Sequence, residues 1–302
     1  MKRTLCILIS LFFCLWLSAQ ERFANYPLPS EPDTLKILAI GNSFSDDGTQ
    51  YLPGLLEAAG IRNVIVARLY IGGCSLERHC REYSEGLNNY TYYKSTQNRW
   101  VTVSKNASFL DGLKDEVWDV ITVQESSGIS GIYDNYEKWL PELLCIIRRE
   151  ALNPQASIGW HKTWAYAANS AHSQFVNYGN DQRRMYSAIG QCVEKATQEF
   201  NLSFVIPSGD AIQTARATRL NNAGEVPADC EVYDLTRDGY HLTRQFGRYI
   251  AACTWFEALI RPVFGKSVLG NGYTLRDTEY SITAKDARLC QKCAVQAVKA
   301  IK

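Results

Sequence analysis

The sequence has 302 residues and nearly balanced charge, with a formal net charge of +1 at pH 7. Because this balance gives no bulk attraction to nucleic acid or to an anionic membrane, we expect neither as a partner. With 46% hydrophobic and 12% aromatic residues, the chain can bury a sizeable core, which argues against disorder.

Residues 1–19 have the organisation of a secretory signal peptide. Lys2 and Arg3 precede an apolar run over residues 5–17, and small residues then come before a polar stretch. The run is shorter than the roughly 20 apolar residues that a membrane-spanning helix needs. We therefore expect a cleaved signal peptide, an extended lead-in at 20–34, and a secreted or periplasmic protein without membrane association after cleavage.

Alternating strand and helix patterns follow along the chain. Short apolar runs predict five β-strands, at residues 35–40, 63–70, 118–123, 157–163 and 202–206. Amphipathic stretches predict helices, at residues 48–60, 136–150, 181–200, 242–260 and 284–301. Short, continuously apolar strands that alternate with helices are typical of a doubly wound, mostly parallel sheet. No linker is evident, so we expect a single domain over 35–302.

Residues 77–117 differ from this pattern because they are polar and rich in tyrosine. We interpret them as an insertion over the core, with a short hairpin around 90–103. Eight cysteines follow the signal peptide, and their even number permits disulfides in an exported protein. The Cys290-x-x-Cys293 pair resembles half of a redox or zinc site, but no second pair or nearby histidine accompanies it. A local disulfide and inert thiols both stay open.

Polar and small residues follow the predicted strands, at the edge of the sheet where ligands bind in open α/β folds. They are Asn42 and Ser43 after the first strand, Gly72 and Gly73 after the second, Gln124 after the third, and Asp238-x-x-His241 before a late helix. No glycine-rich phosphate loop and no metal-ligand spacing of histidines is present. We therefore expect no cofactor and no metal.

These residue types suit nucleophilic catalysis. A serine hydroxyl needs an imidazole to take its proton, and the imidazole needs a carboxylate to hold its tautomer. Ser43 by itself would more commonly be a turn or helix N-cap residue. The Asp238-x-x-His241 block favours Ser43 as nucleophile, His241 as base and Asp238 as the orienting carboxylate, with Asp234 as the alternative carboxylate.

Hydrolysis also needs hydrogen-bond donors for the oxyanion that forms on the substrate. The backbone N–H groups of Ser43 and Gly73, with Gly72 as the alternative, and the side-chain amide of Gln124 are the expected donors. His161 lies between two tryptophans and is expected to be structural or part of a pocket wall.

Residues 41–45, Gly-Asn-Ser-Phe-Ser, resemble the first block of SGNH/GDSL hydrolases, with Asn42 where aspartate is commoner. Gly72-Gly73 is similar to the second block of that family and Asp238-x-x-His241 to its last. The runs 68–76, 124–125, 163–166 and 238–241 resemble the uncharacterised DUF4886 group of SGNH-like proteins.

This resemblance implies a flavodoxin-like, three-layer α/β/α sandwich and metal-independent ester hydrolysis. The third block of the family normally supplies an asparagine, and Gln124 stands there in this sequence. Its amide is therefore expected to act as the third oxyanion donor.

The substrate is expected to be a small ester, foremost an O-acetyl group on carbohydrate, because aromatic side chains can stack on sugar rings. Asn42, Trp164 and Tyr240 are the expected substrate-binding residues, and Trp100 is a further aromatic candidate. A lipid-like acyl ester is an alternative substrate. An alternative of another class is a non-catalytic glycan- or ligand-binding protein on the same scaffold.

Overall fold

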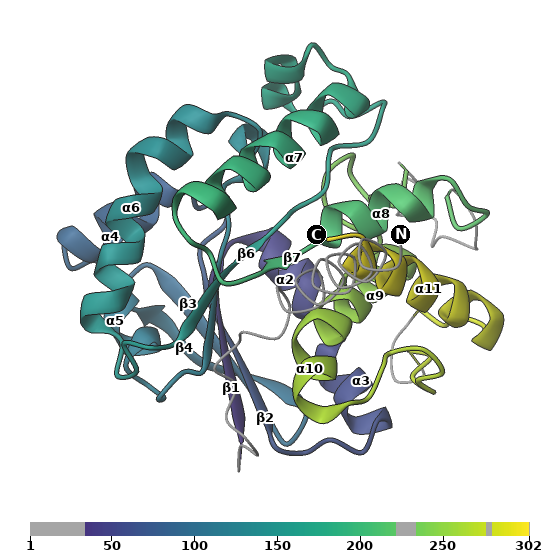
Figure 1. Ribbon diagram of the computed structural model, residues 1–302, viewed down its shortest axis with the longest axis horizontal. Helices are drawn as coiled ribbons and strands as arrows, with labels where there is room; N and C mark the ends of the chain where they lie inside the picture. The colour runs from purple at the N-terminus through teal and green to yellow at the C-terminus, as the bar shows by residue number, and fades with distance from the viewer. Residues whose placement is uncertain (1–33, 222–233, 276–279, 302) are drawn as a thin grey trace, which may run out of the picture.

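The computed structural model describes residues 34–221, 234–275 and 280–301 (Figure 1). The predicted signal peptide, almost all of the predicted lead-in, and Cys230 lie outside these residues. None of the helices within the described ranges has the length and apolar character needed to cross a membrane.

One seven-stranded sheet forms the centre of the molecule, with the strand order β4-β3-β2-β1-β5-β6-β7. The strands are β1 (Leu35–Gly41), β2 (Val64–Tyr70), β3 (Tyr90–Thr96), β4 (Arg99–Ala107), β5 (Val120–Val123), β6 (Ser157–His161) and β7 (Val205–Ile206). Strands β2, β1, β5, β6 and β7 pair in parallel, in the order of the flavodoxin-like doubly wound fold. These are the five strands predicted from the sequence.

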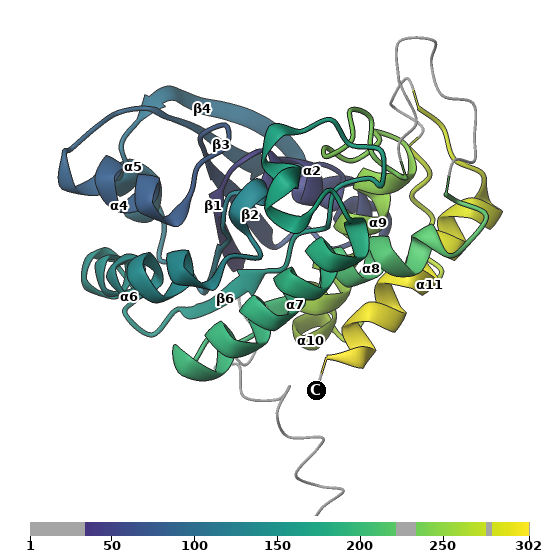
Figure 2. The same cartoon turned by 90° about the horizontal axis from the view of Figure 1, so that it is seen from above.

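Helices cover both faces of this sheet, which gives the predicted three-layer α/β/α sandwich (Figures 1 and 2). One layer holds α2 (Ser43–Thr49), α3 (Leu52–Ala58), α8 (Ser208–Arg216), α9 (Phe246–Trp255), α10 (Arg261–Phe264) and α11 (Ala284–Ala300). The other holds α4 (Leu76–Ser84), α5 (Phe109–Leu113), α6 (Tyr133–Glu150) and α7 (Gln182–Glu199). All residues of β5 and β6 are buried, because helices lie over both faces of these central strands.

The tyrosine-rich segment 77–117 contributes to the sheet itself. Its hairpin, β3–β4, pairs antiparallel with β2 and extends the predicted five strands to seven. Arg68 ties this hairpin to α2, since its guanidinium lies 3.7 Å from the ring centroid of Trp100 and donates to the Asp46 carboxylate. Trp100 also donates its ring N–H to the carbonyl of Gln50 at 3.1 Å. Trp100 therefore packs the hairpin against α2.

The described cysteines are all free thiols, including Cys290 and Cys293, which are buried in α11. Burial raises the pKa of Cys293 to about 11, so this thiol stays protonated at neutral pH. Within the described ranges, no group of three or more histidine, cysteine or acidic side chains is arranged to hold a metal ion.

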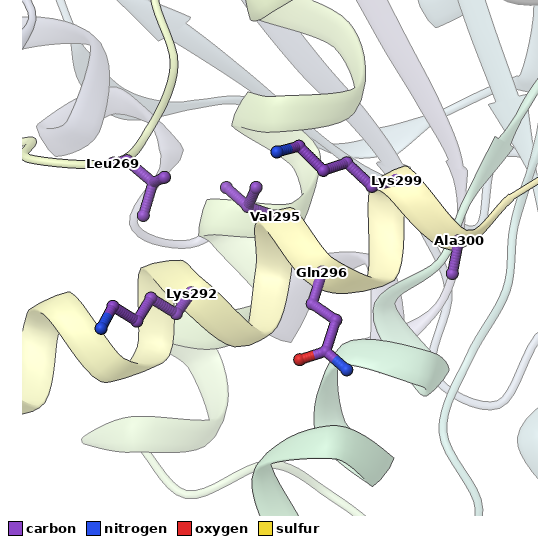
Figure 3. A pocket seen from close by; sticks show the side chains of 6 residues that line it. All are labelled: Leu269, Lys292, Val295, Gln296, Lys299 and Ala300. Carbon is purple, nitrogen blue, oxygen red and sulfur yellow. The ribbon is translucent and has the colours of Figure 1, made fainter.

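A pocket of about 430 Å³ opens along α11 (Figure 3). Its lining residues are Leu269, Lys292, Val295, Gln296, Lys299 and Ala300. None of the predicted site residues belongs to it, so the candidate chemistry lies elsewhere.

Candidate active site

Ser43 is the first residue of α2, directly after the carboxyl end of β1. Asn42 caps this helix, because its side-chain oxygen accepts the N–H of Phe44 at 3.0 Å. The cap leaves the partly exposed Ser43 at the rim of the sheet, with its own N–H among the unpaired donors at the helix start.

A tight turn over residues 235–243 carries the other two predicted catalytic residues. Backbone bonds close it, from Thr243 N to the Leu235 carbonyl and from Arg237 N to the His241 carbonyl, both at 2.8 Å. Gly239, at the tip, has φ +90°, and a Cβ there would lie 3.0 Å from the Cα of Ser170. Glycine is required at this position by both its conformation and its lack of space.

Asp238 organises the tip of the turn. Its Oδ1 accepts the N–H groups of Tyr240 at 3.2 Å and His241 at 2.7 Å, and its Oδ2 lies 2.6 Å from His241 Nδ1. Partial burial alone would raise the pKa of Asp238, but these hydrogen bonds outweigh it and bring the pKa below its ordinary value. The carboxylate is therefore ionised at neutral pH and oriented toward the imidazole.

The other ring nitrogen, His241 Nε2, lies 2.8 Å from Ser43 Oγ. Hydroxyl, imidazole and carboxylate thus form a continuous hydrogen-bonded relay. Asp234, the alternative carboxylate, instead accepts from Ala168 N at 3.0 Å and from the Gln182 amide at 3.1 Å. The geometry selects Asp238 as the partner of His241.

The loop after β2 lies beside the serine. Gly73 has φ +62°, is exposed, and would have open space around a Cβ. Across the described residues, neither Gly73 N nor Ser43 N enters a hydrogen bond within the protein. Asn42 Nδ2 donates to the Cys74 carbonyl at 2.9 Å, which holds this loop against the start of α2. Two unpaired backbone donors therefore lie on adjoining segments, one at the start of α2 and one in the loop held against it.

The chain is similar to a known protein family and to a solved structure from that family. The family model of DUF4886, a domain of unknown function, matches residues 36–297. A DUF4886 family protein from Bacteroides uniformis is 39% identical in its crystal structure, with 88% of this chain and 95% of that chain covered and a TM-score of 0.78. This chain belongs to the DUF4886 family.

More distant solved structures are similar to this DUF4886 protein over much of its length. A GDSL-like lipase from Parabacteroides merdae is 15% identical, with 74% of this chain and 94% of that chain covered and a TM-score of 0.49. An acetylxylan esterase from Geobacillus stearothermophilus is 14% identical, with 76% and 94% covered and a TM-score of 0.44. No curated protein matches the sequence.

Gln124 of the DUF4886 protein does not face the site as an oxyanion donor would. Its side chain is completely buried, and its Nε2 donates to Asn42 Oδ1 at 2.8 Å. Its Oε1 accepts from Ser45 Oγ at 2.5 Å and pairs with His161 Nδ1 at 2.8 Å. The extra methylene relative to asparagine places the amide inside the protein, where it supports the Asn42 cap from below.

His161 extends this buried network of the DUF4886 protein. Its Nε2 lies 3.0 Å from Ser208 Oγ, while its Nδ1 must carry the proton that Gln124 Oε1 accepts. Burial lowers the pKa of His161 to about 3, so the ring is neutral and cannot serve as a second charged base. Sequence reasoning missed the part that Ser45 and Ser208 play in this network. Ser45 belongs to the block at 41–45, but nothing in that block shows that its hydroxyl bonds to Gln124, and Ser208 contributes only through its position in space.

Two of the three expected substrate-binding residues are unavailable to a ligand. Trp164 is completely buried, stacks on Phe44 with ring centroids 4.3 Å apart, and donates to the Tyr240 carbonyl at 2.7 Å. Asn42 is 1% exposed and fully engaged as a cap. Tyr240 is only partly buried, and its ring centroid lies 4.2 Å from that of His241. Tyr240 is the member of the three that borders the site.

Proposed function

We propose that this DUF4886 protein is a serine esterase that hydrolyses a small ester through an acyl-enzyme. This proposal rests on the hydrogen-bonded relay, in which Ser43 Oγ lies 2.8 Å from His241 Nε2 and His241 Nδ1 lies 2.6 Å from Asp238 Oδ2. Both distances lie within the range needed for proton transfer and for fixing the imidazole tautomer.

In this mechanism Ser43 Oγ attacks the ester carbonyl carbon while His241 Nε2 takes the hydroxyl proton. Asp238 stabilises the imidazolium, which then gives its proton to the departing alcohol as the acyl-enzyme forms. A water molecule, deprotonated by His241, attacks the acyl-enzyme and releases the carboxylic acid. Ser43 recovers its proton at the end of the cycle, so atoms and charges balance.

The N–H groups of Ser43 and Gly73 are the proposed oxyanion donors, since both are unpaired and the loop of Gly73 is held against the start of α2. Each such donor supplies about 10²–10³ in rate. Gln124 is left out because its amide is buried. The proposed mechanism therefore uses two backbone donors.

For the substrate we propose an O-acetyl group on carbohydrate. Tyr240 offers a partly exposed ring beside the base, where a sugar ring can stack. A Cβ at Gly73 would meet nothing within 4 Å, so the space beside this glycine is free for the alcohol portion of a substrate. An exported enzyme, released by cleavage of the segment 1–19, would meet such a substrate outside the cytoplasm.

The test compares hydrolysis of p-nitrophenyl acetate by the wild type and by Ser43→Ala. We expect a loss of at least about 10³-fold with unchanged folding, because the nucleophile is removed. Ser84→Ala, an exposed serine on α4, is the matched control and keeps full activity. Equal rates in the wild type and Ser43→Ala would leave a ligand-binding protein on this scaffold as the better account.

A further inference from the structure

Asp47 lies four residues after Ser43 on α2, so one turn of helix places both side chains on the same side. Unlike Ser43, Asp47 is completely buried. A buried carboxylate is costly unless it is fully paired, and this carboxylate has donors from two other parts of the chain.

The first donors come from the turn that carries Asp238 and His241. Leu242 N, the backbone group directly after His241, donates to Asp47 Oδ2 at 2.8 Å. Arg237 Nη1, directly before Asp238, reaches both Asp47 oxygens, at 3.2 and 3.1 Å. The same Arg237 nitrogen also donates to the Leu242 carbonyl at 2.5 Å. Asp47 therefore binds the turn on both sides of its tip, which carries Asp238 and His241.

The second donor is Arg248 in α9. Its Nε lies 2.7 Å and its Nη2 2.6 Å from Asp47 Oδ1, so two nitrogens of one guanidinium contact the same carboxylate oxygen. Such pairs fix geometry better than a single hydrogen bond. Arg248 therefore holds the carboxylate so that it presents Oδ2 to Leu242 N.

These contacts bridge the two parts of the relay. Ser43 belongs to α2, whereas Asp238 and His241 belong to a turn almost two hundred residues later in the chain. The Asp238–His241 pair is held within its own turn, so nothing in that pair sets its distance from Ser43. The Asp47 contact to Leu242 N helps to set this distance, because it joins α2, the helix that carries Ser43, to the residue next to His241. Trp164 forms a second bridge, from Phe44 of α2 to the Tyr240 carbonyl, but through ring stacking and not through an ion-paired carboxylate.

We propose that Asp47 is a positioning residue that sets the distance between the imidazole of His241 and the hydroxyl of Ser43. This inference rests on the proposed function of the same site. Asp47 touches neither substrate nor reacting atoms and acts through the backbone of Leu242. Removal of the carboxylate loosens the turn against α2, where the Trp164 contact alone does not fix it, while the Asp238–His241 pair stays intact.

The experiment measures kcat and KM for p-nitrophenyl acetate in the wild type, Asp47→Asn and Asp47→Ala. A displacement of about 1 Å at a reacting group costs about 10²-fold in rate. We expect kcat to fall about 100-fold in Asp47→Ala with KM within about 3-fold. We expect a smaller fall in Asp47→Asn, whose amide oxygen still accepts from Leu242 N.

Glu257→Gln is the matched control for loss of a buried, paired carboxylate. Glu257 is also buried and accepts from Arg261 Nη1 at 2.6 Å and from Val268 N at 2.9 Å, but its partners are none of the site residues. A similar loss of stability without the loss of kcat is expected there. Equal falls in kcat for Glu257→Gln and Asp47→Asn would overturn the positioning role.

A second readout separates this proposal from the function on which it rests. The ¹⁵N chemical shift of His241 Nε2 reports whether that nitrogen accepts the Ser43 hydroxyl proton. We expect the accepting state in the wild type and its loss in Asp47→Ala, with the Nδ1 proton signal to Asp238 retained in both. This result would support Asp47 even if no ester were hydrolysed.

Unchanged kcat and an unchanged Nε2 shift in folded Asp47 variants would refute the proposal while leaving the esterase intact. Should the Asp47 variants not fold, Arg237→Met replaces them. Arg237 is partly exposed, and this substitution removes its ion pair with Asp47. Because Arg237→Met leaves the bond from Leu242 N to Asp47 in place, we expect a partial shift of His241 Nε2 away from the accepting state, and an unchanged shift would count against Asp47.

Discussion

Ser43 and His241 are separated by 198 positions in the chain, yet Ser43 Oγ and His241 Nε2 lie 2.8 Å apart. Parallel strands bring the first of these residues to the rim of the sheet, and the turn over residues 235–243 brings the second. Neither residue is reactive alone, because a serine hydroxyl holds its proton at neutral pH. The contact between them is what makes hydrolysis a chemical option for this fold.

Asp238→Asn tests the orienting carboxylate. The asparagine amide cannot stabilise the imidazolium and favours the wrong imidazole tautomer, so we expect kcat to fall about 10³–10⁴-fold with little change in KM. Steady-state kinetics with p-nitrophenyl acetate measures this. Asp234→Asn is the control, because Asp234 does not contact His241 and asparagine tolerates its φ of +43°. A larger loss in Asp234→Asn than in Asp238→Asn would reverse the assignment of the carboxylate.

Tyr240→Ala tests the proposed sugar contact. The N–H of residue 240 still donates to Asp238 after this change, so the turn is retained. We expect KM for an acetylated oligosaccharide to rise about 10-fold, in line with the loss of a stacked ring worth about 1.4 kcal/mol, and KM for p-nitrophenyl acetate to change little. Equal effects on both substrates would argue against carbohydrate stacking at this ring.

Gln124→Met tests whether the buried amide supports the site or takes part in it. Methionine fills the same space but leaves the His161 Nδ1 proton without an acceptor. We expect the free energy of unfolding to fall by about 2 kcal/mol or more, as urea denaturation measures. A change below about 0.5 kcal/mol, together with a large fall in kcat, would restore Gln124 as a direct oxyanion donor.

Glu125→Gln tests a buried acid next to that network. Glu125 Oε1 accepts from Ser126 N at 2.6 Å and from Leu76 N at 3.1 Å, while Oε2 is buried without a partner. Burial raises the pKa of Glu125 from 4.5 to about 7. Between these pH values the folded protein holds a proton that the unfolded chain has released. The resulting stability is complete below about pH 4.5 and is lost as pH rises through 7.

Glutamine mimics the protonated acid, and its oxygen still accepts both N–H groups. Urea unfolding of the wild type and Glu125→Gln should therefore agree at pH 4.5, whereas at pH 8.5 the variant should be more stable by about 3 kcal/mol. The low pKa of His161 destabilises both proteins equally in acid and cancels in the comparison. A variant that is less stable than the wild type at pH 8.5 would show that the carboxylate is ionised favourably.

The parallel core was predictable because strands such as β1 are apolar along their whole length, as burial on both faces requires. The hairpin β3–β4 was harder to predict as part of the sheet. Along β4 most side chains are exposed, so no buried face produced an apolar alternation. The pairing with β2 depends instead on backbone bonds, which leave little trace in residue type.

At the site, residues whose type and motif indicate a chemical role were predictable from the sequence. The direction in which a side chain points was not predictable. Ser43, Asp238 and His241 each occur where a strand end or turn predicts exposure. Whether Gln124 and Trp164 face the solvent or the interior depends on distant partners such as His161 and Phe44. Those partners become neighbours only when β5 and β6 pair and Phe44 of α2 stacks on Trp164.

Asp238 and His241 occupy one short turn whose own backbone bonds bring the carboxylate to the imidazole. The imidazole and its carboxylate are therefore oriented toward each other by contacts within a few residues of chain. The contact between Ser43 and His241, by contrast, depends on how segments far apart in the chain pack together, so a change remote from both residues can break it.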